Sequence, residues 1–596
     1  MILKALYDYY NRHEELPPLG YTVKKIRYII VIDYDGTFLR LEDRGKDASS
    51  MVIKGANNIT SGVYANVLWG KSKYMINLDN KTNRISQKHN KWFNCNYKKT
   101  SIVADLYSDN KEFKAVKNFY DREEFRRVEY DALWSDISHK DNSLMSFQIQ
   151  GNYNIVAEQC HDLDDYVKRF FLEDIDVSKN EKEICLITGN KANPSMSLTM
   201  TPILNAGKGK LVSFQKDIGF DSYEKQQGLN APISKEAEFY CFTALQHLLR
   251  NDSKNKFILG DRTFVFWSSS NNEWTEEAES LFLKIIGFGN KDNPDRHVDI
   301  IYKSFQSLFS GKKISNSNDK FYILGLAPFN EARIGVIYWK EINVKGFAEN
   351  IQQHFDDIHI YNNNQYIGLY DIIDAVSVKS PKDKKGKISP NIPEAVIKSI
   401  IECTPYPYSL FSACLRRLKA VSFSEDKEEK SKKENIKFFK IRIAILKGYL
   451  NRLRNNNNKQ LKKMLDKTND NIGYLCGRLF ATLVKIQEDA KKIKTGSGRA
   501  STIRRRFMSS ASTTPAVIFS SLLNLSIHHE EDLPIDKRVF FDKLKSEIIE
   551  KISSAGFPAH LDINNQARFF VGYYHQRQDF FTSKAEKENN DNNINN

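Results

Sequence analysis

The stretch NIGYLCGRLFATLVKIQEDAKKIKTGSGRASTIRRR, from Asn471 to Arg506, combines two characters that decide how the C-terminal part of the chain folds. Its first half repeats apolar residues at helical spacing, as in Leu475, Leu479 and Leu483. Neighbouring apolar residues such as Phe480 widen this stripe beyond what a surface helix needs. The pattern therefore predicts a helix at the centre of a helical bundle.

The second half of the same stretch is strongly basic. Gly496-Ser497-Gly498 interrupts the helix, and only Glu488 and Asp489 oppose the positive charge. The cationic residues are Lys485, Lys491, Lys492, Lys494, Arg499, Arg504, Arg505 and Arg506. A well-packed helix followed by concentrated positive charge is typical of a scaffold that holds a polyanion. A solvated charged loop is the alternative interpretation of the same residues.

The whole chain has the composition of a globular protein with a basic surface. Its 596 residues are 41% hydrophobic, which is enough for several cores, and carry a net charge of +15. That charge favours nucleic acid or an anionic surface as partner. The opening residues lack the apolar segment of a signal peptide, and no apolar run reaches the length of a membrane span. We expect a cytoplasmic protein.

The seven cysteines are scattered, without a C-x-x-C pair. This arrangement predicts neither a disulfide framework nor a zinc site, and we expect no metal or cofactor.

One short motif, Asp33-Tyr34-Asp35-Gly36, suggests a catalytic site. An apolar strand ending in D-x-D-G-T is found in haloacid-dehalogenase-type phosphatases, where the first aspartate attacks phosphorus. Asp-Gly is also a favoured hairpin turn, and the following TFLRL alternates like a returning strand. In a phosphatase a helix should follow the loop. The residues favour the hairpin and leave a phosphatase using Asp33 and Asp35 as an alternative.

The organisation changes along the chain. Residues 25–41 predict two strands, residues 110–175 are predicted to be helical, and strands return at 321–339. A lysine- and proline-rich segment, 376–393, is the predicted linker, and beyond it strands nearly vanish. The predicted helices there span 394–402, 406–420, 435–454, 472–493, 515–527 and 536–554. The sequence thus predicts an α+β protein with a mixed α/β domain over 1–390 and a helical bundle over 391–596.

Several longer segments together resemble a known family, the large subunit of the type I-C CRISPR surveillance complex (type I-C Cascade). In the N-terminal part these are MILKALYDYYNR, CLITG, LVSFQKDIGFDSYEKQQGLNAPISKEAEF and FYILGLAPFNEARIGVIYW. In the C-terminal part they are TPYPYSLFSACLRRLKA, IRIAILKGYLNR, GYLCGRLFATLVKIQEDA, SASTTPAVIFSSLLNLSIHH and FVGYYHQRQ. The resemblance covers nearly the whole chain.

The resemblance implies a binding protein without catalytic activity. Such a subunit recognises a short protospacer-adjacent motif in duplex DNA, helps to open the duplex and holds the displaced strand. It assembles with CRISPR RNA and with backbone, guide-processing and small subunits, and it later provides the docking surface for a helicase-nuclease. The family also implies a small subunit made by internal translation, for which Met464 is the candidate start and residues 464–596 the product.

Two sets of residues are candidates for these contacts, because phosphates and minor-groove base edges are bound by basic and amide side chains. The motif-reading candidates are Asn66, Lys71, Lys73, Lys191, Lys208, Lys210 and Asn230. The displaced-strand candidates are Lys494, Arg499, Arg504, Arg505 and Arg506, followed by Lys440, Arg442, Arg452 and Arg454. A generic basic nucleic-acid-binding scaffold outside CRISPR remains an alternative function.

Overall fold

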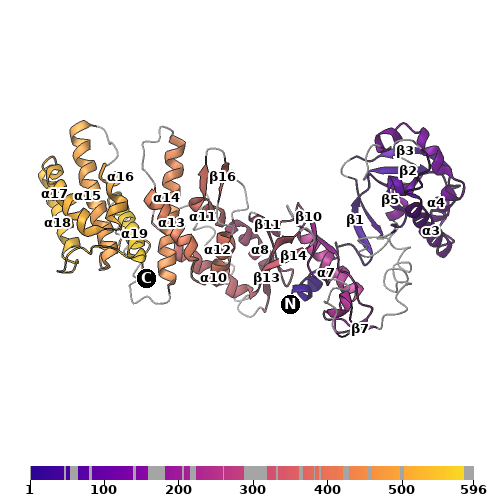
Figure 1. Cartoon of the computed structure of the whole chain (residues 1–596), viewed down its shortest axis with the longest axis horizontal. Helices are drawn as coiled ribbons and strands as arrows, with labels where there is room; N and C mark the ends of the chain where they lie inside the picture. The colour runs from indigo at the N-terminus through magenta and orange to yellow at the C-terminus, as the bar shows by residue number, and fades with distance from the viewer. Residues whose placement is uncertain are drawn as a thin grey trace. The chain divides into compact units, whose positions relative to one another are not determined.

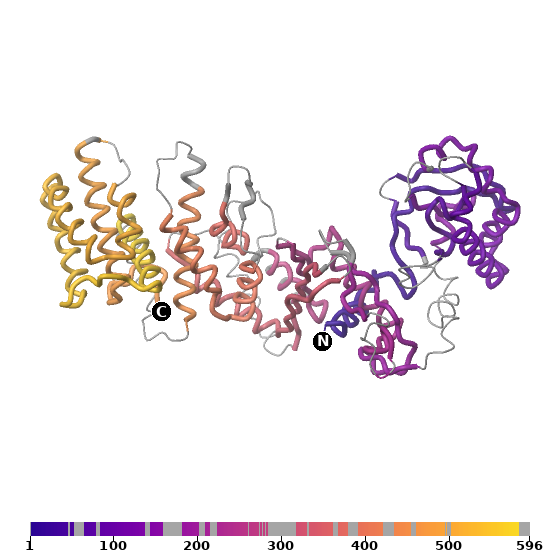
Figure 2. Tube along the Cα trace, in the orientation of Figure 1, coloured from indigo at the N-terminus to yellow at the C-terminus, as the bar shows by residue number. Residues whose placement is uncertain are grey.

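Figures 1 and 2 show the computed structural model of the chain, coloured by residue number. Its residues group into two compact units. One unit comprises Met1–Ser269 with Tyr322–Lys340, and the other comprises Ser270–Phe321 with Glu341–Asn596. The described residues are 2–45, 48–53, 63, 65–78, 84–138, 143–158, 182–203, 207–214, 223, 225–259, 261–286, 318–330, 333–361, 367–380, 383–387, 391–420, 429–453, 460–496 and 502–582.

A four-stranded sheet forms the first core of the N-terminal unit. Its strands lie in the order β3 (Phe38–Asp43), β2 (Tyr28–Ile32), β6 (Leu144–Ile149) and β5 (Trp69–Lys71). Strand β2 pairs antiparallel with β3 and parallel with β6, and all five of its residues are buried. Such an all-apolar strand needs cover on both faces. Helix α4 (Lys111–Asp121) supplies part of that cover through Phe119, whose ring lies 5.2 Å from that of Phe147.

Strand β6 corrects the prediction that residues 110–175 are helical throughout. Helix α4, a 3-10 helix (Glu124–Tyr130) and α5 (Trp134–Ser138) occupy the first part of that range. Residues Leu144–Ile149 are instead a strand that pairs with β2 and β5. The partner strands lie far away in the sequence, so this pairing overrides the local helical preference. Part of the range, 159–181, lies outside the described residues.

A six-stranded sheet and two helices form the second core of this unit. The strands lie in the order β11 (Lys256–Leu259), β12 (Arg262–Ser268), β13 (Lys320–Asn330), β14 (Arg333–Asn343), β10 (Gly207–Lys210) and β9 (Met200–Ile203). Helices α1 (Ile2–Tyr10) and α7 (Lys235–Leu248) share its buried apolar cluster, which includes Leu6, Leu245 and Trp267. A smaller ribbon pairs β1 (Tyr21–Lys25) with β4 (Ser49–Ile53).

The C-terminal unit is built mainly of helices, which confirms the predicted class of a mixed α/β region followed by a helical region. Among the described residues, its helices are α8 (Glu273–Ile286), α10 (Val344–Ile358), α11 (Leu369–Val376), α12 (Asn391–Ile401), α13 (Tyr408–Ala420), α14 (Glu429–Arg452), α15 (Ile472–Thr495), α16 (Thr502–Ala511), α17 (Pro515–Glu530), α18 (Ile535–Ile549) and α19 (Ile563–Asp579).

Two details of the sequence-based division differ from the structure. The predicted linker contains a short antiparallel pair, β15 (Val378–Ser380) with β16 (Asp383–Lys387). Residues from Glu341 onward group with the C-terminal helices, so position 390 lies inside the second unit. The functional division into 1–390 and 391–596 stays a prediction.

Helices α15 and α19 approach each other more closely than ordinary side chains allow. A Cβ atom added at Gly477 would lie 2.0 Å from the carbonyl oxygen of Phe569, and one at Gly572 would lie 2.3 Å from that of Tyr474. A Cβ atom added at Gly473 would likewise lie 2.3 Å from the carbonyl oxygen of Asn565. Because backbone faces backbone at these points, a larger residue could only fit by separating the helices.

We expect Gly477→Ala to destabilise the C-terminal unit by about 3 kcal/mol or more. The added methyl group would collide with backbone atoms, which cannot move aside as the end of a flexible side chain can. Gly346→Ala in α10 is the matched control, since the nearest atom to its added Cβ is 3.9 Å away. That control should leave stability unchanged or raise it by up to about 1 kcal/mol. Thermal or urea unfolding measures both, and equal stability of the two variants would contradict the close packing.

Candidate nucleic-acid interface

The two acidic residues of the basic stretch, Glu488 and Asp489, form ion pairs with lysine and arginine side chains. Arg577 of α19 contacts Glu488 with 2.6 Å between Nη1 and Oε2. Lys485 contacts Asp489 at 2.7 Å, and Lys537 of α18 lies 3.5 Å from the other oxygen of the same carboxylate. The negative charge of α15 is therefore neutralised inside the helical unit, and it does not offset the cations that follow.

Helix α16 is fixed onto α15 by one buried glutamine. Gln487 donates from Nε2 to the hydroxyl of Thr502 at 3.0 Å and accepts at Oε1 from the backbone N–H of Ile503, also at 3.0 Å. It thereby satisfies a backbone donor that the first turn of α16 leaves without a helical partner. This contact sets where the arginines of α16 lie.

The three consecutive arginines of α16 differ in their surroundings. Arg504 is half-buried, with its guanidinium carbon 5.7 Å from the ring centroids of both Phe439 and Tyr573. Arg505 and Arg506 are exposed, and the described part of the chain provides no ion pair for either. They are the displaced-strand candidates best placed to meet an external polyanion.

Lys494 and Arg499 complete the first set of displaced-strand candidates. Lys494 is exposed and lies 2.7 Å from Asp532. Exposed pairs of this kind contribute little stability, so the lysine can exchange partners at low cost. Arg499 lies outside the described residues.

The second set of displaced-strand candidates is largely built into the helical core. Arg442 is buried and donates to the carbonyl of Ala375 at 2.7 Å, and burial lowers its pKa to about 10. Arg452 contacts Asp357 at 2.5 Å and donates to two backbone carbonyls. Their positions argue against strand binding, since a buried arginine with satisfied donors supports packing. Lys440 is half-buried, which lowers its pKa, and Arg454 lies outside the described residues.

Three motif-reading candidates lie together beside the four-stranded sheet. Lys71 ends β5, and Lys73 lies in the short helix α2 (Ser72–Met75) with its ammonium 5.6 Å from the ring centroid of Tyr74. Asn66 is half-buried in the segment before β5, where Lys99 of α3 (Asn90–Leu106) donates to the carbonyl of Ala65 at 2.8 Å.

The remaining motif-reading candidates lie in the segment between residues 191 and 230. Lys191 is exposed on β8 (Lys191–Ala192), and the side chain of Lys208 lies outside the described residues. Lys210 is half-buried, which lowers its pKa, and it donates to the hydroxyl of Ser197. Asn230 donates to the carbonyls of Lys225 and Gln227, at 3.0 and 3.1 Å, and so stabilises its own turn.

Sequence reasoning overlooked part of the basic surface near Lys71 and Lys73. Lys88 precedes helix α3 and Lys91 lies in its first turn, and both are exposed. The signal that could have found them was charge density, because residues 65–104 contain eight lysines and arginines and a single acidic residue, Asp79. The aromatic pair Tyr74 and Trp92, also overlooked, stacks at this surface with ring centroids 5.4 Å apart.

The motif at Asp33 is a hairpin turn, as the residues favoured. Strand β3 follows it and pairs antiparallel with β2. The Asp33 carboxylate accepts the backbone N–H groups of Asp35 at 3.0 Å and Thr37 at 2.8 Å, and Gly36 has φ of +88°. A phosphatase loop would lead into a helix, so this geometry removes the structural basis of that alternative. Among the described residues, no group of three or more histidine, cysteine or acidic side chains could hold a metal ion.

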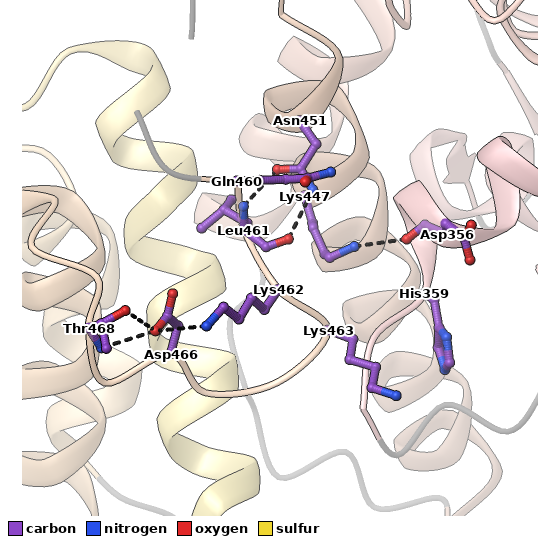
Figure 3. A pocket seen from close by; sticks show the side chains of 10 residues that line it. All are labelled: Asp356, His359, Lys447, Asn451, Gln460, Leu461, Lys462, Lys463, Asp466 and Thr468. Carbon is purple, nitrogen blue, oxygen red and sulfur yellow. Dashed lines mark hydrogen bonds and ion pairs between the residues drawn. The ribbon is translucent and has the colours of Figure 1, made fainter. Parts of the chain in front are cut away.

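A pocket of about 580 Å³ lies where the segment before α15 meets α10 and α14 (Figure 3). Lys447 donates there to the carbonyls of Asp356 and Asp357, at 3.0 and 2.9 Å. Asn451 and Leu461 exchange two hydrogen bonds of 2.9 Å. The pairing of Asn451 with Leu461 ties the residues just before Met464 to α14.

Two buried histidines make the stability of this unit depend on pH. His354 contacts the hydroxyl of Tyr406 at 2.6 Å and His575 that of Tyr474 at 3.0 Å. Desolvation by burial lowers the pKa of each to about 3, and a nearby cation contributes in both cases. Both imidazoles are therefore neutral in the folded protein.

We expect the free energy of unfolding to fall as pH decreases from about 6.5 towards 3, because the unfolded chain binds protons that the folded histidines exclude. The loss is up to about 1.4 kcal/mol per pH unit for each histidine. In chemical denaturation at pH 7 and pH 5, His575→Asn should reduce this slope, while the same change at exposed His528 should not. An unchanged slope in His575→Asn would contradict the assignment.

Comparison with known proteins gives one strong finding. The family model described as CRISPR-associated protein (Cas_Csd1) matches residues 6–581. No curated protein matches the chain. Among the residues that the structure describes, no helix is both long and apolar enough to cross a membrane.

Proposed function

The chain belongs to the Cas_Csd1 family, the large subunit of the type I-C Cascade, and from this membership we propose that it recognises the protospacer-adjacent motif in duplex DNA, helps to open the duplex and holds the displaced strand. In the proposed complex, guide pairing supplies sequence specificity, so the protein needs positive surfaces and a modest reader of base edges. CRISPR RNA, the other Cascade subunits and, later, a helicase-nuclease are its proposed partners. Its proposed location is the cytoplasm.

The distribution of charge on α15 and α16 carries the proposal for the displaced strand. Glu488 and Asp489 are neutralised by Arg577, Lys485 and Lys537, whereas Arg505 and Arg506 are exposed without an ion pair in the described part. A surface that keeps uncompensated arginines on a rigid helix suits the phosphates of single-stranded DNA.

The basic surface formed by Lys71, Lys73, Lys88 and Lys91 is the proposed reader of the motif. Lysines that reach phosphates position the duplex, and an amide such as that of Asn66 can contact a minor-groove base edge. The proposal includes no bond-breaking step by this chain, since the degradation of DNA is assigned to the recruited helicase-nuclease. A complex purified without guide RNA would instead favour a generic nucleic-acid-binding scaffold.

We expect the double charge reversal Arg505→Glu/Arg506→Glu to weaken target binding by the assembled complex at least about tenfold at physiological salt. The slope of log affinity against log salt should become shallower by about 0.7 for each single-strand phosphate that the variant no longer neutralises. Binding to a target strand that lacks its complement should stay unchanged, because no strand is then displaced.

The matched control is Lys345→Glu/Lys543→Glu, which changes the net charge equally at two exposed lysines of α10 and α18. If the two double variants bind duplex target equally well, with the same salt slope, the assignment of α16 is wrong.

Residues 464–596 are also proposed to be made separately, starting at Met464. The contacts of Asn451 with Leu461 and of Tyr361 with Lys463 lie entirely before this start. The hydrogen bond from the backbone of Asp466 to Tyr474, 3.1 Å, and the packing of α15 on α19 lie within the product. The proposed fragment therefore retains its closest helix packing.

Changing Met464 to isoleucine should remove a short C-terminal product from cells that express the full gene, as detected with a C-terminal tag. Met508→Leu should leave that product in place. Recovery of the short product from the Met464→Ile gene would show that translation does not start there.

A further inference from the structure

An aromatic pair lies at the surface of the N-terminal unit, between two helices that are separate in the sequence. Tyr74 belongs to α2 and Trp92 to the first turn of α3. Their ring centroids are 5.4 Å apart and their planes differ by 12°, so the rings are stacked. Both side chains are only half-buried, although Phe93 beside them is buried. The pair therefore keeps part of its surface accessible to solvent.

Buried aromatic residues next to the pair fix its position. The Phe93 ring lies 4.9 Å from that of Phe125 and 5.6 Å from that of Tyr120, which anchors the start of α3 in the core. The edge of the His89 ring meets Tyr74 at 5.8 Å. A surface aromatic pair held in this way loses little conformational entropy when it binds a flat ligand.

Positive charge lies near the pair. The ammonium of Lys73 lies 5.6 Å from the Tyr74 ring centroid, and exposed Lys91 directly precedes Trp92. Exposed Lys88 lies just before the same helix, whose first turn contains no acidic residue. The dipole of the α3 N-terminus adds to this field. A flat aromatic surface with cations close to it fits a nucleobase together with its flanking phosphates.

We propose that the Tyr74–Trp92 pair stacks an unpaired DNA base beside the recognised motif, with Lys73, Lys88 and Lys91 holding the neighbouring phosphates. The inference rests on the proposed function and extends it by naming the groups that stabilise the opened junction. Opening a duplex costs the stacking of at least one base step, and an aromatic platform returns part of that free energy.

The test uses the assembled complex and a target whose base pairs next to the motif are mismatched, so that a 2-aminopurine placed there is unpaired and fluorescent. Binding to the wild-type complex should quench the probe at one position. Trp92→Leu should abolish the quenching at saturating complex and weaken binding of fully paired target about tenfold. Trp92→Phe retains an aromatic ring and should retain most of the quenching.

Tyr153→Leu is the matched control, because Tyr153 is an exposed aromatic residue of the same unit and should give wild-type quenching. Thermal unfolding identifies any variant that fails to fold. If Trp92→Leu fails to fold, Trp92→Phe keeps the test valid. Unchanged quenching in Trp92→Leu would overturn the inference. Quenching of a probe in the guide RNA before target is added would also overturn it, because the pair would then bind RNA.

The outcomes also separate this inference from the proposed function. Suppose that Arg505→Glu/Arg506→Glu loses target binding while Trp92→Leu leaves quenching unchanged. The proposal of the aromatic platform would then be wrong, and the proposed function would stand. Wild-type target binding by both variants would count against strand holding by α16 and against the aromatic platform.

Discussion

The contact of backbone with backbone between α15 and α19 is the constraint on which the C-terminal unit depends. Gly477 and Gly572 leave no room for a Cβ atom, so the two helices pack backbone against backbone. This crossing places Arg577 of α19 against Glu488 of α15, and through Gln487 it also sets the start of α16. A rigid helix pair thus determines both which charges are paired internally and which remain on the surface.

The same principle separates structural from available cations. Lysines and arginines are abundant throughout this chain, but a cation can bind nucleic acid only where the fold leaves it accessible. Arg442 and Arg452 hydrogen-bond to backbone carbonyls inside the helical core, whereas Arg505 and Arg506 do not reach it. In the N-terminal unit the exposed Lys88 and Lys91 lie at the start of the helix that contains Trp92. In the proposed function, cationic and aromatic side chains that the fold holds in fixed positions bind the DNA.

Elements with strong local signals could be predicted from the sequence. The apolar stripe of α15 predicted residues 472–493 as a helix, and the structure has Ile472–Thr495. Asp33-Tyr34-Asp35-Gly36 predicted a hairpin because Asp-Gly favours that turn. Elements that depend on distant partners were missed, such as β6, which pairs with β2, and helices α16 and α19. The ion pair of Arg452 could not be predicted either, because its partner Asp357 lies far away in the sequence. Charge composition shows how many cations a segment has, and the fold decides which of them are paired.

Hydrogen exchange of the assembled complex, with and without matched duplex target, tests the central claim most directly. The account predicts that the amides of α15 and α19 are strongly protected in both states, because the glycine crossing is a scaffold that DNA does not alter. It predicts that the first turns of α16 and the segment from Lys88 to Trp92 gain protection only when target is bound. Target binding that leaves both of these segments unchanged, or that loosens the α15–α19 crossing, would contradict it.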